Sequence, residues 1–175
     1  MFRIRLIVMA LALAACAEPR PEAALDLEPC TIQGLPDCVR AGALTFGGQP
    51  TADALRLLAA RGYRTVISTR GEGELDWDEH ALVAGLGMRY VAIPMASPVT
   101  SITDSQVAAL DAALASEGPT LLHCSSGNRA AGLWGAWLAE RRGVDRARAL
   151  ALAEQAGMTR TREVVEARLH GAATR

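Results

Sequence analysis

The chain of 175 residues is long enough for one domain with a buried core, and 50% of its residues are hydrophobic. Its formal net charge of −1 argues against a nucleic-acid-binding protein, which usually carries a basic excess. All 18 of its basic residues are arginines. Lysine chemistry, such as a Schiff base or the lysine of a nucleotide-binding loop, is therefore excluded.

The N-terminus has the layout of a secretory signal. A short basic segment precedes an uncharged apolar run at residues 6–14, and small residues end that run. The run is shorter than the roughly 20 apolar residues that a membrane-spanning helix needs. The ending Leu-Ala-Ala-Cys at residues 13–16 resembles the bacterial lipoprotein box, which implies lipidation of Cys16. The alternative is an ordinary signal in which Cys16 is incidental.

Both interpretations predict an exported protein. We expect a signal peptide at residues 1–15, a lipidated tether rich in proline and glutamate at 16–29, and one folded domain at 30–175. The lipid would hold the domain at the periplasmic face of a bacterial membrane, so the membrane is a predicted partner.

The remaining cysteines are assigned on the basis of this export, because disulfides are permitted outside the cytosol. Cys30 and Cys38 close a short loop and are predicted to form a disulfide. Metal binding by this pair is the weaker interpretation, since no histidine cluster accompanies it. Cys124 then remains as the unpaired thiol.

Apolar periodicity and capping residues predict helices that alternate with strands. Thr103 is the expected cap of the third helix and Asp145 that of the fifth. The buried strands should lie in a mostly parallel sheet of about four strands, flanked by helices in an α/β fold. The predicted helices span residues 51–61, 78–86, 103–116, 129–141, 145–156 and 162–169, and the strands that can be located span 65–68, 89–93 and 119–123.

Residues 123–130, His-Cys-Ser-Ser-Gly-Asn-Arg-Ala, form the turn between the last of these strands and the next helix. Backbone N–H groups and the helix dipole make an anion site in such a turn. Gly127 permits a backbone conformation that other residues resist, and Arg129 adds a planar guanidinium that suits a tetrahedral oxyanion. Helix N-termini and nearby cations also favour a thiolate. We therefore predict Cys124 as a nucleophile, with the attacked anion bound by Ser125, Ser126, Gly127, Asn128 and Arg129.

The alternative for Cys124 is a buried structural cysteine before an ordinary helix. That alternative does not explain the surrounding small residues, or an arginine at a helix N-terminus, where the dipole disfavours a cation. His123 is predicted to lie buried beneath the loop and to support it. Trp134 and Trp137 are expected in the core rather than in a substrate platform.

The order His-Cys-x-x-Gly-x-Arg resembles the signature of cysteine-based protein tyrosine and dual-specificity phosphatases. The segments FGGQP at 46–50, GYRTVISTR at 62–70 and MRYVAIP at 88–94 look like the phosphatase-like domain of the beta-lactamase-hydrolase-like group. The resemblance covers about residues 40–158. It implies a fold like that of the dual-specificity phosphatases, with Cys124 as nucleophile and Arg129 as oxyanion binder.

The sequence departs from the usual phosphatase pattern at two points. Four residues separate Cys124 from Arg129, where the usual loop has five. Ala130 then stands where phosphatases usually have serine or threonine. A loop of this length also occurs in many rhodaneses, which transfer sulfur through a cysteine persulfide. His123, by contrast, favours a phosphatase.

A phosphatase also needs a general acid to protonate the leaving oxygen. In the family, that acid is an aspartate on the loop after the strand that matches residues 89–93. Only Asp104 is available there, and it would serve equally well as a favourable charge at a helix N-terminus. Asp76 and Asp78 are weaker candidates. Persulfide chemistry needs no such acid.

Three functions follow from these residues. The first is an exported cysteine-dependent phosphatase that acts through a phosphocysteine. The second is a rhodanese-like sulfurtransferase that acts through a persulfide on Cys124, and the third is a non-catalytic oxyanion-binding module. The predicted substrate carries a phosphoryl group or sulfane sulfur, and no cofactor, metal or nucleic acid is expected.

Overall fold

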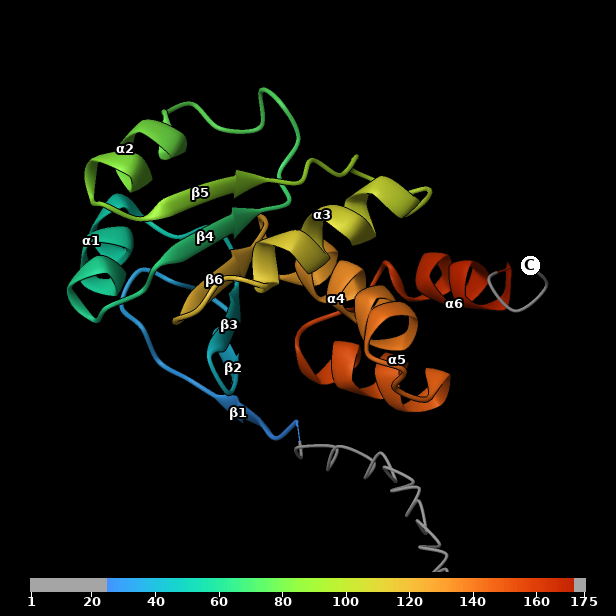
Figure 1. Cartoon of the computed structure of the whole chain (residues 1–175). Helices are drawn as coiled ribbons and strands as arrows, with labels where there is room; N and C mark the ends of the chain where they lie inside the picture. The colour runs from blue at the N-terminus through green and yellow to red at the C-terminus, as the bar shows by residue number, and fades with distance from the viewer. Residues whose placement is uncertain (1–24, 172–175) are drawn as a thin grey trace, which may run out of the picture.

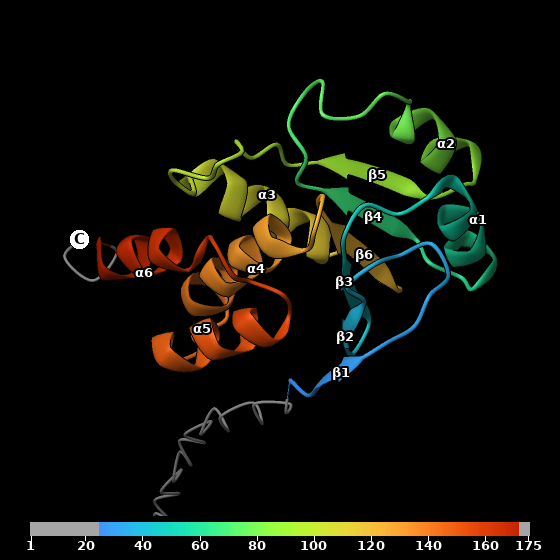
Figure 2. The ribbon, with the colours of Figure 1, turned by 180° about the vertical axis from the view of Figure 1, so that it is seen from behind.

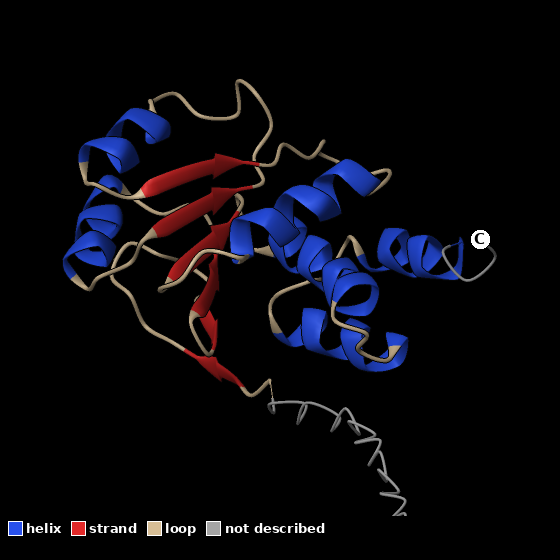
Figure 3. Ribbon diagram, in the orientation of Figure 1, coloured by secondary structure: helices blue, strands red, loops and turns tan. Residues whose placement is uncertain are grey.

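The computed structural model describes residues 25–171 of the chain. The predicted signal peptide, Cys16 and most of the predicted tether lie outside the described residues. Figure 1 shows a central sheet with helices on both sides, and Figure 3 shows the same arrangement with strands and helices in separate colours. The α/β class is therefore confirmed.

The sheet has six strands in the order β1-β2-β3-β6-β4-β5. Strands β3, β6, β4 and β5 pair in parallel, whereas β1 and β2 extend the sheet in antiparallel fashion beside β3. The strands are β1 (Leu27–Pro29), β2 (Val39–Ala41), β3 (Leu44–Gly47), β4 (Thr65–Ser68), β5 (Arg89–Ala92) and β6 (Thr120–His123).

The expectation of about four strands was too low. The three strands nearest the N-terminus have no continuous β-branched or apolar run like those that mark β4 and β6. β2 and β3 form a hairpin in which Gly42 takes a φ of 59°. β1 lies within the segment predicted as tether, so the folded part begins before residue 30.

Helices follow the parallel strands much as predicted. Thr51, Asp78, Thr103 and Asp145 each cap a helix through a side-chain oxygen that accepts a backbone N–H. The helices are α1 (Ala52–Ala60), α2 (Glu79–Gly85), α3 (Asp104–Leu114), α4 (Asn128–Arg141), α5 (Arg146–Gln155) and α6 (Arg162–Gly171).

Two hydrophobic cores fill the two faces of the sheet. α1 and α2 cover one face, and α3 to α6 cover the other, as the two opposite views in Figures 1 and 2 show. Val66 and Leu121 contribute to the smaller core, while their neighbours Ile67 and Leu122 contribute to the larger one. This alternation explains why the strands are apolar throughout.

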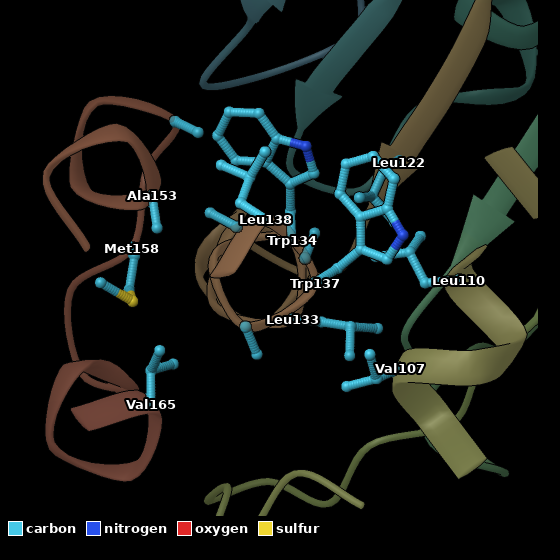
Figure 4. Packing of buried hydrophobic residues seen from close by; sticks show 14 of the residues in the cluster. Val107, Leu110, Leu122, Leu133, Trp134, Trp137, Leu138, Ala153, Met158 and Val165 are labelled. Carbon is cyan, nitrogen blue, oxygen red and sulfur yellow. The ribbon is translucent and has the colours of Figure 1, made fainter. Parts of the chain in front are cut away.

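α4 lies at the centre of the larger core. Figure 4 shows its side chains between α3 on one side and the α5–α6 region on the other. Trp134 is almost fully buried, Trp137 is 9% exposed, and the indole Nε1 of Trp137 donates to Asp111 at 2.8 Å. Both tryptophans therefore belong to the core, as predicted. A helix packed on so many sides holds its N-terminus in a fixed position.

A disulfide joins Cys30 to Cys38, the pairing that the sequence predicted. It closes the loop between β1 and β2. Among the described residues, none of the helices has the length and apolar content required to cross a membrane.

Candidate functional site

The site lies where the parallel strands reach their carboxyl ends. In the register of the sheet, His123 at the end of β6 stands beside Gly47 of β3 and Ser68 of β4. The chain continues from these three positions into loops at one edge of the sheet, where ligands of open α/β sheets bind. Cys124 is the first residue beyond β6.

The loop after β6 turns directly into α4. Gly127 precedes the helix with a φ of 75°, a left-handed conformation that glycine adopts without steric cost. Gly48 on the neighbouring strand end allows a close approach, since a Cβ atom there would lie 2.9 Å from the carbonyl oxygen of Ser125. The sequence therefore places glycines at the two positions that the turn requires.

The first backbone amides of α4 have no hydrogen-bond acceptor within the helix. Ala131 makes the first bond of the helix, to the carbonyl of Gly127, so the amides of residues 128–130 have no carbonyl one turn earlier. These amides and the helix dipole favour an anion at this end.

Cys124 lines a cavity of about 250 Å³ at this edge of the sheet. The residue is 1% exposed and its thiol is free. The cavity wall consists of three segments: the loop and helix start from Cys124 to Arg129, residues 97–99 after β5, and residues 160–161 between α5 and α6. The thiol is thus buried from bulk solvent but borders a space large enough for a small anion.

Arg129 reaches the same cavity and is fixed by a two-point ion pair. Its Nη1 and Nη2 donate to the two carboxylate oxygens of Glu74, each at 2.6 Å. Nη1 also donates to the carbonyl of Met95 at 2.9 Å, and Nη2 lies 3.4 Å from the hydroxyl of Ser125. Bidentate pairing of this kind fixes both the position and the plane of a guanidinium.

Glu74 is itself held by the loop after β4. The amide of Gly71 donates to Oε1 of Glu74 at 3.0 Å, and the Nε of Arg70 lies 3.4 Å from its Oε2. The hydrogen bonds from Arg129 lower the pKa of the Glu74 carboxyl, against a smaller opposing effect of burial. The same pair, with a contribution from nearby Cys124, raises the pKa of Arg129. The pair therefore stays ionised.

A buried carboxylate, Glu79, supports the floor of the loop. His123 is fully buried, and its Nε2 lies 3.4 Å from Oε2 of Glu79, the first residue of α2. Glu79 also accepts hydrogen bonds from Nε2 of Gln49 at 2.7 Å and from the hydroxyl of Tyr90 at 3.2 Å. Burial acts to raise the pKa of Glu79, but the contacts with His123, Gln49 and Tyr90 outweigh it and lower the pKa.

Replacing Glu79 with alanine is expected to destabilise the fold. The change leaves the donors of Gln49 and Tyr90 without their acceptor and removes the carboxylate beside the His123 ring, and a buried polar group left unsatisfied costs about 1–3 kcal/mol of unfolding free energy. Urea unfolding followed by circular dichroism measures the loss. Glu117→Ala, at an exposed position in the loop between α3 and β6, is the matched control. A loss for Glu79→Ala no larger than that of the control would show that the network does not stabilise the loop.

Asn128 links the loop to a distant part of the chain. Its Oδ1 accepts from the amide and the hydroxyl of Thr159 and from the amide and the hydroxyl of Thr161, at 2.8 to 3.2 Å. Its own carbonyl lies 3.1 Å from the same Thr161 hydroxyl, whose one proton is shared between the two oxygens of Asn128. The Asn128 side chain is therefore directed at the segment between α5 and α6, and its backbone amide is the part available to an anion.

The structure does not bring Asp104 to the cavity wall. Asp104 is the first residue of α3, and its carboxylate accepts from Nη2 of Arg168 at 2.9 Å. Arg168 also binds Glu140 and the carbonyl of Ile102, so it fastens the segment after β5 to α4 and α6. Asp78, a weaker candidate, caps α2. Asp104 stays a prediction as general acid, and no carboxylate occurs among the residues that line the cavity.

A larger hollow of about 490 Å³ lies at the opposite ends of the strands, near the disulfide. Arg40, Arg61 and Tyr63 contribute to its wall, but the only cysteine there is the disulfide-bonded Cys30. Within residues 25–171, no group of three or more His, Cys, Asp or Glu side chains is placed to hold a metal ion.

Glu74, Glu79 and Arg160 are the site residues that the sequence analysis missed. Glu74 lies in the acidic, glycine-rich loop after β4, and its position beyond the carboxyl end of a strand is the signal that could have found it. Glu79 has the appearance of an ordinary acid in the first turn of a helix. Nothing local marks Arg160, because it reaches the cavity through the tertiary contacts of Asn128.

The comparisons with known proteins agree with this geometry. The family described as "Beta-lactamase hydrolase-like protein, phosphatase-like domain" matches residues 41–140, which is more than half of the chain. The beta-lactamase hydrolase-like protein of Xylella fastidiosa (strain Temecula1) is 38% identical over 93 residues, and that of Agrobacterium fabrum is 33% identical over 97 residues. These matches cover 50% and 52% of this chain, but only 21% and 22% of the two relatives.

Solved structures show the same fold at lower identity. TpbA of Pseudomonas aeruginosa is 21% identical with a TM-score of 0.64, covering 83% of this chain and 91% of TpbA. Tk-PTP in its active form is 22% identical with a TM-score of 0.59, covering 73% of this chain and 91% of Tk-PTP. These likenesses support the phosphatase fold. The family match over residues 41–140 shows that the chain belongs to the phosphatase-like domain family of the beta-lactamase hydrolase-like proteins.

Proposed function

We propose that this protein is a cysteine-dependent phosphatase that hydrolyses phosphate monoesters through a phosphocysteine intermediate. The observation that carries the proposal is the convergence of the Cys124 thiol, the Arg129 guanidinium and the free amides of α4 on one cavity. A nucleophile placed beside preorganised oxyanion donors is the arrangement that covalent phosphoryl transfer requires.

The reaction has two steps. In the first, the thiolate of Cys124 attacks phosphorus, an S–P bond forms and the P–O bond to the leaving group breaks, while Arg129 and the loop amides hold the non-bridging oxygens. The leaving oxygen takes a proton from water, since no carboxylate occurs among the residues that line the cavity. In the second, water attacks phosphorus, the S–P bond breaks, and inorganic phosphate leaves with the thiolate restored.

The substrate class follows from the fold and from the lining of the cavity. TpbA has been crystallised in complex with phosphotyrosine (pTyr). The absence of a carboxylate among the residues that line this cavity favours esters whose leaving group needs little protonation, as an aryl oxygen does. Aryl phosphates, including phosphotyrosine, are therefore the first substrates to test.

Sulfur transfer is the second candidate, and two observations favour it. Four residues separate Cys124 from Arg129, and the residues that line the cavity offer no acid. In this reaction the thiolate of Cys124 would take sulfane sulfur from thiosulfate, sulfite would leave, and an acceptor thiol would then remove the sulfur. Neither step needs a proton donor for the leaving group.

A paired assay on the full chain distinguishes the two activities. One arm measures phosphate release from 4-nitrophenyl phosphate, and the other measures sulfur transfer from thiosulfate to cyanide. We expect phosphate release well above sulfur transfer. Sulfur transfer without phosphate release would overturn the phosphatase proposal, and the absence of both activities alongside binding of inorganic phosphate would favour an oxyanion-binding module.

We also propose that the protein is exported and anchored through Cys16, a residue outside the described part of the chain. The proposal rests on the basic, apolar and small-residue pattern of residues 1–16. Metabolic labelling with a fatty acid in a bacterial host tests it. Incorporation that is retained in Cys16→Ala would contradict it.

A further inference from the structure

A second arginine reaches the cavity of Cys124 from a different part of the fold. Arg160 lies between α5 and α6, and it lines the same cavity of about 250 Å³ as Cys124 and Arg129. The distance along the sequence between Arg129 and Arg160 is large, so the tertiary structure alone places them at one site.

The two arginines differ in their partners. Arg129 is buried, and both carboxylate oxygens of Glu74 balance its charge. Arg160 is exposed and makes no hydrogen bond, ion pair or ring contact with any residue of the described part of the chain. Since the lining contains no carboxylate, the charge of Arg160 is not balanced within the cavity.

The backbone around Arg160 is held by hydrogen bonds to Asn128, the first residue of α4 after the Cys124 loop. Its neighbours Thr159 and Thr161 donate four hydrogen bonds to the side-chain oxygen of Asn128, which is 7% exposed. Thr161 is 2% exposed and also binds the carbonyl of Asn128. A single buried amide oxygen on the first residue of α4 therefore holds both flanks of Arg160, and it sets where this side chain can reach.

We propose that Arg160 is a specificity-determining residue that binds a second anionic group on the substrate, next to the phosphoryl group that Cys124 attacks. The proposal rests on the proposed phosphatase function and adds its substrate class: monoesters that carry a neighbouring phosphate or carboxylate. A guanidinium suits either group, because its fork of N–H donors matches two oxygens of one anion. Arg129 and the loop amides bind the scissile phosphoryl group. Arg160 therefore remains available to bind the second anionic group.

The experiment compares phenyl phosphate with 3-carboxyphenyl phosphate and with 1,3-phenylene bisphosphate. For each substrate, kcat/KM is measured in the parent chain and in Arg160→Ala. The comparison is made within each substrate, so differences in leaving-group ability cancel. Arg148→Ala is the matched control, because it removes the same charge from an exposed position on α5. Thermal unfolding of each variant shows whether the fold is retained.

We expect Arg160→Ala to lower the preference for the bisphosphate over phenyl phosphate by about tenfold or more, the size of one charge-assisted hydrogen bond. A loss with the bisphosphate but not with the carboxylate would identify phosphate as the second group, and equal losses would identify any anion. Arg148→Ala should leave the preference unchanged. An unchanged preference in Arg160→Ala, or a loss equal in all three substrates, would overturn the proposal.

A binding measurement separates this proposal from the phosphatase function. Titration calorimetry on Cys124→Ser compares inorganic pyrophosphate with inorganic phosphate, with and without Arg160→Ala. Tighter pyrophosphate binding that Arg160→Ala removes would support the second subsite even if the parent chain released no phosphate. Phosphate release by the parent chain, together with pyrophosphate binding unaffected by Arg160→Ala, would refute the subsite and leave the phosphatase function intact.

Discussion

Replacing Cys124 with serine is expected to reduce phosphate release from 4-nitrophenyl phosphate by about 10⁴-fold or more. The serine hydroxyl has the same place at the floor of the cavity, but it is not ionised near neutral pH and no residue on the cavity wall is placed to act as its base. The substitution changes one buried atom, so the fold and the amides of α4 should be unaffected.

The control for this prediction is anion binding. Because the loop amides and Arg129 remain in place, Cys124→Ser should still bind inorganic phosphate, and it should unfold within a few degrees of the parent chain. Turnover in the serine variant above a hundredth of the parent rate would show that another group performs the displacement.

Arg129→Lys is expected to lower kcat/KM by about 10²–10³-fold, the range for the loss of one oxyanion donor. Lysine keeps the positive charge, but a single ammonium cannot bond to both oxygens of Glu74 and also present a planar edge to the substrate. Kinetics at a fixed pH with 4-nitrophenyl phosphate measure the effect. Because lysine keeps the positive charge, a large loss of kcat/KM would show that the planar shape of the guanidinium is required.

Arg141→Lys is the matched control, since Arg141 is an exposed arginine at the far end of the same helix. It should retain the parent kcat/KM. Glu74→Gln supplies a second comparison, because it keeps the shape of the pair and removes the charge that fixes Arg129. An Arg129→Lys variant within tenfold of the parent chain would contradict a role for the bidentate guanidinium.

Much of the fold could be predicted from local sequence because its signals are local. The β-branched run at β4 and the apolar run at β6 mark buried strands, and the capping residues Thr103 and Asp145 mark the starts of α3 and α5. The short strands β1, β2 and β3 have no comparable pattern. Their pairing depends on the hairpin at Gly42 and on the neighbouring β6, which are features of the folded chain.

The site residues also fall into those that local sequence marks and those that only the folded chain brings together. Cys124, Gly127 and Arg129 are close together in the sequence, so their shared turn could be predicted from residue types alone. Glu74 and Glu79 approach that turn from loops and helices more than 40 residues away, and each looks like an ordinary surface acid when taken by itself. The parallel register of β4 beside β6 brings the segments that follow the two strands to one edge of the sheet, where Glu74 reaches Arg129 and Glu79 reaches His123.

The central claim is that the thiol of Cys124 becomes covalently attached to the phosphoryl group that Arg129 and the loop amides hold. Mass spectrometry of the full chain, quenched in acid during turnover of 4-nitrophenyl phosphate and digested, tests this claim directly. We expect one added phosphoryl group on the peptide that contains Cys124, and none in Cys124→Ser. Steady phosphate release with an unmodified Cys124 peptide, or a phosphoryl group on another residue, would contradict the account.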